Sequence, residues 1–177
     1  MQIVDYETKP LSREKIRTLV KVIRKIFNIK NTKFPVLKVL DMLEKDGVIY
    51  VVEDDKKFKK NVMAYLEPTN EGYCIHIRNS VYDGACEGEG KCLGYICHEE
   101  CHFFLIEYFG FKPIYGRSMK DRIIPACRSM EWQAKAMCGE LMIPIEECYN
   151  MSIEEIMITT NSSYQQSEYF ASVTKYK

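Results

Sequence analysis

The spacing of two histidines constrains this chain more than any other feature. His98 and His102 are two of the three histidines in 177 residues, and with Glu99 they form the pattern His-Glu-x-x-His. Residues four apart share one face of an α-helix, so the pattern predicts a helix that presents two imidazoles to one point. Imidazole nitrogens placed in this way can bind one metal ion at about 2.0–2.1 Å. The alternative is that both histidines are hydrogen-bonded members of a helix packed on the core.

A catalytic zinc site has three protein ligands and an open fourth position, so the two histidines need a further donor. Glu131 is the best candidate, because it begins the helix expected after the motif helix. Its alternative role is that of a first-turn glutamate stabilised by the helix dipole. Glu99 flanks the same metal and is suited to accept a proton from metal-activated water. The pattern therefore predicts metal-assisted hydrolysis, with one zinc ion per chain and Glu99 as general base.

Composition favours one compact domain over residues 1–177. The chain is 46% hydrophobic and 12% aromatic, which argues against disorder, and its 25 basic residues equal its 25 acidic ones. This balance gives no general attraction to nucleic acid or to anionic membranes, so we expect neither as a direct partner. We see no signal peptide and no apolar run of about 18 residues. The expected location is cytoplasmic, with the eight cysteines reduced.

Apolar periodicity and capping residues predict several helices. Ser12 caps a helix over roughly residues 13 to 27, whose basic face (Arg17, Lys21, Arg24 and Lys25) is expected to be solvated. Pro35 opens a second helix that Gly47 ends. The motif helix is expected from about Cys92 to Tyr108, and the Glu131 helix from about Ser129 to Leu141. A further helical start at 153–158 precedes a polar stretch at 159–166.

Three short apolar runs predict a small sheet, and hence an α+β fold. These runs, Val48 to Glu53, Val62 to Leu66 and Tyr73 to Arg78, suggest a three-stranded antiparallel meander. Alternation in the last run places His76 on the polar face of a strand, and we do not expect it to bind the metal. Residues 83–90 are expected to form a flexible acidic loop, and the basic connection before Pro125 could cover a cleft.

Longer motifs around these residues resemble a known family. Residues 79–85 (NSVYDGA), the His98 to His102 motif and residues 131–144 (EWQAKAMCGELMIP) look like the ImmA/IrrE family of zinc peptidases. The resemblance covers roughly residues 70 to 145, whereas the tail from 145 to 177 matches only loosely. It implies a gluzincin-like fold with His98, His102 and Glu131 as zinc ligands and Glu99 as general base. Family members of known role are anti-repressors that cleave a helix-turn-helix repressor encoded nearby, often in phages or integrative elements.

The chain departs from the family pattern beside the histidines. Where the family reads His-Glu-Leu-Gly-His, this chain has Glu100 and Cys101, and Cys97 precedes His98. The two thiols are expected to pack as small hydrophobic groups, with oxidation or competition for zinc as the alternative. No separate helix-turn-helix or sensor domain is recognisable.

Two functions of different classes remain open at this stage. The first is a zinc-dependent endopeptidase acting on a protein substrate, a helix-turn-helix repressor being the expected one. The second is a catalytically silent, metal-dependent binding protein of a phage, toxin-antitoxin or stress system. For the first, Tyr73 to Arg78 could offer a sheet edge to an extended peptide. Tyr115 and Arg117 are candidate oxyanion stabilisers, with ordinary surface positions as the alternative.

Overall fold

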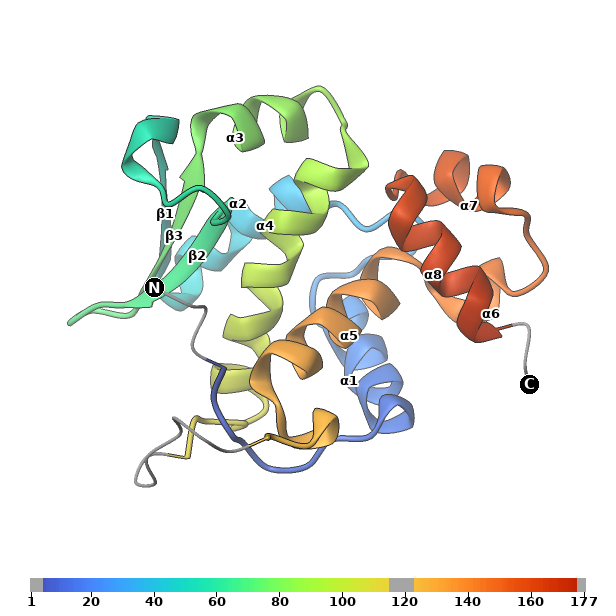
Figure 1. Cartoon of the computed structure of the whole chain (residues 1–177), viewed down its shortest axis with the longest axis horizontal. Coiled ribbons are helices and arrows are strands. Elements are labelled where there is room, and N and C mark those ends of the chain that lie inside the picture. The colour runs from blue at the N-terminus through green and yellow to red at the C-terminus, as the bar shows by residue number, and fades with distance from the viewer. Residues whose placement is uncertain (1–4, 115–122, 175–177) are drawn as a thin grey trace.

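The computed structural model describes residues 5–114 and 123–174 of the chain and shows an α+β fold (Figure 1). The helices are α1 (Arg13–Ile26), α2 (Val36–Leu43), α3 (Asn79–Cys86), α4 (Gly90–Phe103), α5 (Met130–Met142), α6 (Ile145–Cys148), α7 (Ile153–Thr160) and α8 (Tyr164–Thr174). The strands are β1 (Val48–Glu53), β2 (Ala64–Pro68) and β3 (Tyr73–Arg78).

The strands form a mixed sheet in the order β1-β3-β2. β3 pairs antiparallel with β2 but parallel with β1, so the expected antiparallel meander is wrong for one of its two pairs. The connection at residues 54–63 is far longer than a hairpin turn, and it brings β2 to the far side of β3. Ile75 and Ile77 of β3 are fully buried, and the central position suits this apolar strand. β3 is therefore not a sheet edge, and the edges are β1 and β2.

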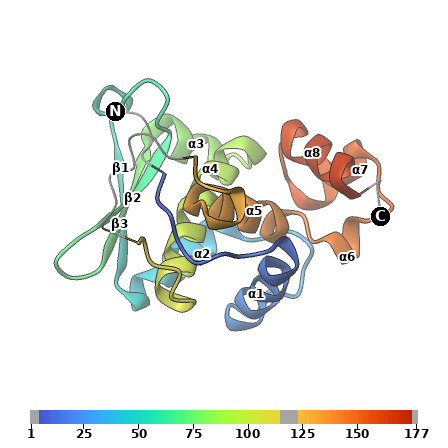
Figure 2. The same cartoon turned by 60° about the horizontal axis from the view of Figure 1, so that its bottom comes forward.

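The helices lie on one side of the sheet, and α4 occupies the centre of the molecule (Figures 1 and 2). α4 contacts β2 on one side and α5 on the other. The residues of β1, β2 and β3 that face the helices belong to one hydrophobic core with residues of α4 and α5. The motif helix is thus held between the sheet and the helix that carries Glu131.

Capping residues set the helix ends where the sequence predicts them. The Ser12 hydroxyl accepts the backbone N–H of Lys15 at 3.2 Å, and the Ser129 hydroxyl accepts that of Trp132 at 2.9 Å. Gly47 has a φ of 79°, the left-handed conformation that favours glycine after a helix. α4 starts at Gly90 and continues through a π-helical turn to Tyr108, close to the expected span.

Three helices were not predicted from the sequence: α3, the short α6 and α8. α3 lies partly in the expected acidic loop, and α8 lies partly in the expected polar stretch. α3 has no side-chain cap of its own, but Asp55 accepts both the backbone N–H and the hydroxyl of Ser80 near its start. α8 is polar, and its helix depends on the side chains that it buries, Ser167 and Phe170 among them.

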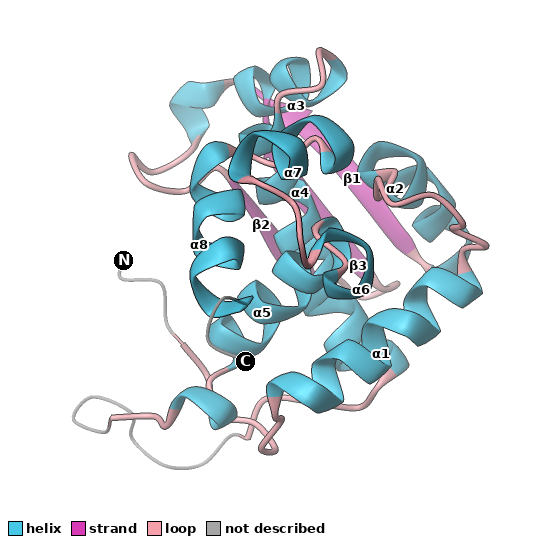
Figure 3. Cartoon of the chain, turned by 90° about the vertical axis from the view of Figure 1, so that its right-hand side faces the viewer, coloured by secondary structure: helices cyan, strands magenta, loops and turns pink. Residues whose placement is uncertain are grey.

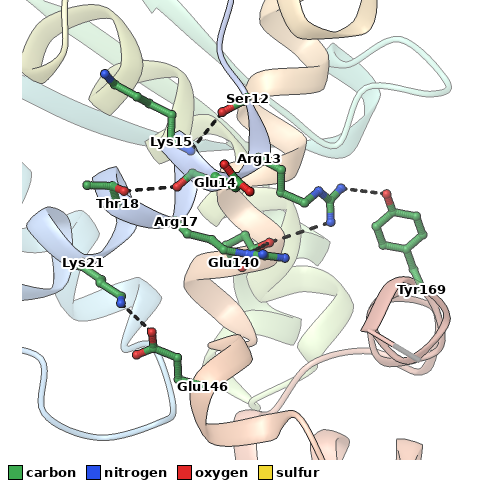
Figure 4. A network of polar contacts seen from close by, with 10 residues as sticks. All are labelled: Ser12, Arg13, Glu14, Lys15, Arg17, Thr18, Lys21, Glu140, Glu146 and Tyr169. Carbon is green, nitrogen blue, oxygen red and sulfur yellow. Dashed lines mark hydrogen bonds and ion pairs between the residues drawn. The ribbon is translucent and has the colours of Figure 1, made fainter. Parts of the chain in front are cut away.

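The basic face of α1 is not simply solvated (Figure 4). Arg17 donates to Glu140 of α5 at 3.0 Å, and Lys21 pairs with Glu146 of α6 at 2.6 Å. Arg24 donates to the backbone carbonyl of Leu141 at 2.9 Å. The expectation was wrong because the periodic pattern shows which residues share a helix face but not which acidic side chains lie opposite.

The C-terminal helices pack against the start of α4, and Figure 3 views the molecule from this end. The Asn161 side chain, between α7 and α8, donates to the Gly88 carbonyl at 2.7 Å. Ile156 and Phe170 join the same hydrophobic core as the rest of the chain. Among the described residues, no helix is both long and apolar enough to cross a membrane.

Candidate metal centre

α4 brings the two histidines together as the spacing predicts. The Nε2 atoms of His98 and His102 lie 3.2 Å apart, and the two rings are nearly perpendicular, with an interplanar angle of 86°. His102 is buried, whereas the His98 side chain retains a quarter of its exposure. Both ring nitrogens therefore point to one place that solvent can reach from one side.

Glu131 completes this cluster from α5. Its Oε2 atom lies 3.2 Å from His98 Nε2, and its Oε1 atom lies 3.3 Å from His102 Nε2. The three side chains form a group of potential metal ligands whose donor atoms all lie within 4.8 Å of one another. The structure thus brings together the three residues that the sequence analysis proposed as ligands.

The donor set fits a zinc ion. Ligand atoms at about 2.0–2.1 Å from a tetrahedral ion lie about 3.3–3.4 Å from one another. The two imidazole Nε2 atoms are 3.2 Å apart, and each lies 3.2 or 3.3 Å from a different carboxylate oxygen of Glu131. With one donor atom from each residue, the three donors lie within 4.8 Å of one another. Two imidazoles and one carboxylate are also the ligands of a common type of catalytic zinc site. The three residues can therefore hold the ion without rearrangement of the helices.

Electrostatic interactions at this cluster favour positive charge. Burial opposes protonation of His98, but the hydrogen bond with Glu131 and the charge of Glu99 outweigh it and raise the pKa of His98 to about 9. Burial likewise opposes ionisation of Glu131, yet its hydrogen bonds to His102 and His98 hold the pKa of this carboxyl well below its usual range. The carboxylates that stabilise a proton on His98 also favour a metal cation at the same point.

Glu99 lies on a different face of α4 and points towards the sheet. Its Oε2 atom accepts the backbone N–H of Leu66 in β2 at 3.0 Å. Burial raises the pKa of the Glu99 carboxyl above its usual value, although the charges of His102 and His98 oppose this shift. The contact with Leu66 could not be predicted from the sequence, because the donor is a backbone N–H group and any residue type can supply it.

The residues that depart from the family pattern are all buried. Cys97, Glu100 and Cys101 are completely inaccessible to solvent. Burial raises the pKa of the Cys101 thiol, and its hydrogen bond with Cys97 raises the pKa of the Cys97 thiol. This environment suits the expectation that both thiols pack as small hydrophobic groups. Neither carboxyl oxygen of Glu100 has a hydrogen-bond partner among the described residues, and burial raises the pKa of this carboxyl well above its usual value.

The remaining candidates do not join the cluster. His76 hydrogen-bonds to Glu53 at 2.8 Å and to Glu67 at 3.2 Å, and its ring stacks on Tyr65. This arrangement confirms that His76 is a polar-face residue and no part of the metal cluster. Tyr115 and Arg117 lie outside the described residues.

A search against protein-family models matched none of them, and a search of curated proteins found no match. The features that point to a function are therefore the His-Glu-x-x-His motif of His98, Glu99 and His102 and the convergence of Glu131 on its histidines.

Proposed function

We propose that the protein is a zinc-dependent endopeptidase. The observation that carries the proposal is the convergence of His98, His102 and Glu131, whose donor atoms lie within 4.8 Å of one another, so that one zinc ion could bind all three. Glu99 follows the first of these ligands in the chain, as the His-Glu-x-x-His mechanism requires of a general base. The resemblance to ImmA/IrrE peptidases supports the same activity.

Each residue then has a distinct role. A bound zinc ion supplies Lewis acidity, which polarises the scissile carbonyl and makes water more acidic. His98, His102 and Glu131 would hold the ion, and Glu99 would accept the proton of the attacking water and pass it to the leaving amine. The N–H of Leu66 fixes one oxygen of Glu99, so the other remains available for this proton transfer.

β2 is the strand best placed to bind a peptide. The sequence analysis assigned this role to Tyr73–Arg78, but that strand is central and has both sides paired. β2 is an edge strand next to α4, and its Leu66 N–H points away from β3 towards Glu99. An extended peptide added along this edge would pass beside the metal ligands. We propose a flexible or locally unfolded segment of a helix-turn-helix repressor as the substrate.

The Glu99→Gln variant tests the catalytic assignment. It keeps the size and hydrogen-bonding capacity of the side chain but cannot accept the proton, so hydrolysis should fall by at least about 10²-fold while zinc content stays at the parent level. Purified parent and variant would be incubated with a repressor encoded beside the gene, and the fragments identified by mass spectrometry. Equal cleavage by both proteins would refute the role of Glu99.

The same assay separates the proposal from the binding-only alternative. If the parent binds the repressor without cutting it, and binding survives Glu99→Gln, the protein is a metal-dependent binding protein and no peptidase for this partner. Cleavage by the parent that is lost in the variant would support the endopeptidase.

A further inference from the structure

The backbone donors at the start of α5 are all satisfied, and the N-terminal segment supplies two of the acceptors. The N–H of Gln133 bonds to the Ser129 carbonyl at 3.0 Å, and that of Trp132 to the Ser129 hydroxyl. The N–H of Met130 bonds to the Tyr6 carbonyl at 3.0 Å. The N–H of Glu131 bonds to the Asp5 carboxylate at 3.1 Å. A helix start usually obtains such acceptors from adjacent residues, whereas two of the acceptors at α5 come from Asp5 and Tyr6, near the N-terminus of the chain.

Residues 5–11, which we call the N-terminal strap, are fixed to the chain around the start of α5 at several further points. The backbone N–H groups of Thr8 and Leu11 donate to the carbonyls of Arg128 and Cys127, both at 2.8 Å. The Gln133 side chain donates to the Lys9 carbonyl, also at 2.8 Å. The strap is therefore a firmly bound support for α5, and Asp5 lies at the end of it nearest to Glu131.

Asp5 holds the backbone of Glu131, the third proposed metal ligand. Glu131 is the second residue of α5, in the turn where a helix frays most easily, and its side chain must reach two imidazoles at once. The Asp5 carboxylate holds the backbone N–H of this same residue. Removing a group that orients a metal ligand without touching the ion typically weakens metal binding by about 10–100-fold.

We propose that Asp5 is a positioning residue that holds Glu131 in place for the metal ion. The inference rests on the metal site of the proposed function, but it concerns a residue that does not touch the ion. It assigns to the N-terminal strap a role beyond stability: the strap sets the geometry of the third ligand.

Zinc affinity tests this inference. Purified full-length variants would be titrated with Zn²⁺ in competition with a chromophoric chelator, at 25 °C, with folding checked by circular dichroism. Asp5→Ala should bind zinc about 10-fold more weakly than the parent. Asp5→Asn keeps an oxygen that can accept the Glu131 N–H, so it should stay within about 3-fold of the parent.

A second capping residue provides the matched control. Ser152→Ala removes the side-chain cap of α7, which lies at the other end of the molecule from the sheet, so it should lower stability and leave zinc affinity unchanged (Figure 1). Loss of affinity in Ser152→Ala equal to that in Asp5→Ala would show a general stability effect and overturn the inference.

Three further results would also count against the inference. Parent-like zinc affinity in folded Asp5→Ala would overturn this inference but not the proposed function. Equal losses of affinity in Asp5→Asn and Asp5→Ala would do the same, because the charge of Asp5 and not its hydrogen bond would then be responsible. Failure of the parent to bind zinc would overturn both this inference and the proposed function. If Asp5→Ala does not fold, Asp5→Leu takes its place, because leucine has nearly the shape of aspartate but cannot accept the Glu131 N–H. A folded Asp5→Leu variant should then lose about 10-fold in zinc affinity, and parent-like affinity would overturn the inference.

Discussion

At the scale of single residues, the metal centre contains three side chains that can bind a cation, and next to them one buried carboxyl group that has no hydrogen-bond partner among the described residues. His98, His102 and Glu131 support one another through mutual hydrogen bonds. Glu100, between the two histidines in sequence, is completely buried, and within residues 5–114 and 123–174 its carboxyl oxygens have no hydrogen-bond partner. Burial of such a group without compensation is costly, so Glu100 should weaken the fold.

Replacing Glu100 by leucine should therefore stabilise the protein. Leucine has a similar volume and needs no hydrogen bonds, and we expect a gain of about 1–3 kcal/mol in the free energy of unfolding. Urea denaturation of the parent and the variant measures this difference. Glu154→Leu, at an exposed position of α7, is the control and should change stability by less than about 0.5 kcal/mol. A Glu100→Leu variant less stable than the parent would show that Glu100 has a partner at its buried position.

The sequence predicts the ligands better than the groups that hold them. His98 and His102 follow from helical spacing, and the ligands that zinc requires call for a third donor. Glu131 was the best candidate for it because it begins the next helix, and the resemblance to the ImmA/IrrE family implied the same role. The supports of Glu99 and Glu131, Leu66 and Asp5, could not be predicted in this way. Both act through hydrogen bonds that involve backbone groups of distant segments, and neither residue type at its position carries a recognisable signal.

At the scale of elements, helices with a local capping residue can be predicted from the sequence, whereas helices stabilised by residues distant in sequence cannot. α1 and α5 start where Ser12 and Ser129 indicate. α3 was missed because Asp55, which lies outside the helix and 24 residues before its start, accepts the backbone N–H and the hydroxyl of Ser80 in place of a local cap. The order of the strands was missed because residue patterns identify strands but not their neighbours.

Asp55 makes the stability of α3 depend on pH. Its hydrogen bonds from Ser80 lower the pKa of this carboxyl below its usual value, so the folded state binds its proton less readily than the unfolded state. The stabilisation is complete above the usual carboxyl range and is lost as pH falls through the lowered pKa. Asp55→Ala should therefore be less stable than the parent at pH 7, and the difference should shrink towards pH 3. Thermal unfolding at several pH values measures it, and a difference that does not change with pH would contradict the role of the ionised carboxylate.

At the scale of the whole molecule, the C-terminal helices are part of the support of α4. Gly90, the first residue of α4, lies so close to the α7–α8 connection that a Cβ atom there would be 2.4 Å from the Asn161 carbonyl oxygen. The obstacle is backbone, which cannot move without displacing the helices. The loosely matched tail is thus packed against the helix that carries the histidines.

Two glycine-to-alanine substitutions test this packing. Gly90→Ala should destabilise the protein by about 1–3 kcal/mol through overpacking against residues 161–163. At Gly139, in the interior of α5, an added Cβ atom would have no atom of the described residues within 4 Å apart from its own helix backbone. Gly139→Ala should therefore stabilise by about 0.5–1 kcal/mol through helix propensity. Thermal or urea unfolding gives both values. Stabilisation by both substitutions would mean that the C-terminal helices do not pack closely on α4 in solution.

The central claim is that His98, His102 and Glu131 bind one catalytic metal ion. The most direct measurement is elemental analysis of protein purified without chelator, comparing the parent with His98→Ala and Glu131→Ala. The account predicts about one zinc per parent chain and loss of that zinc in both folded variants. A folded parent without bound metal, or variants that keep the full zinc content of the parent, would contradict it.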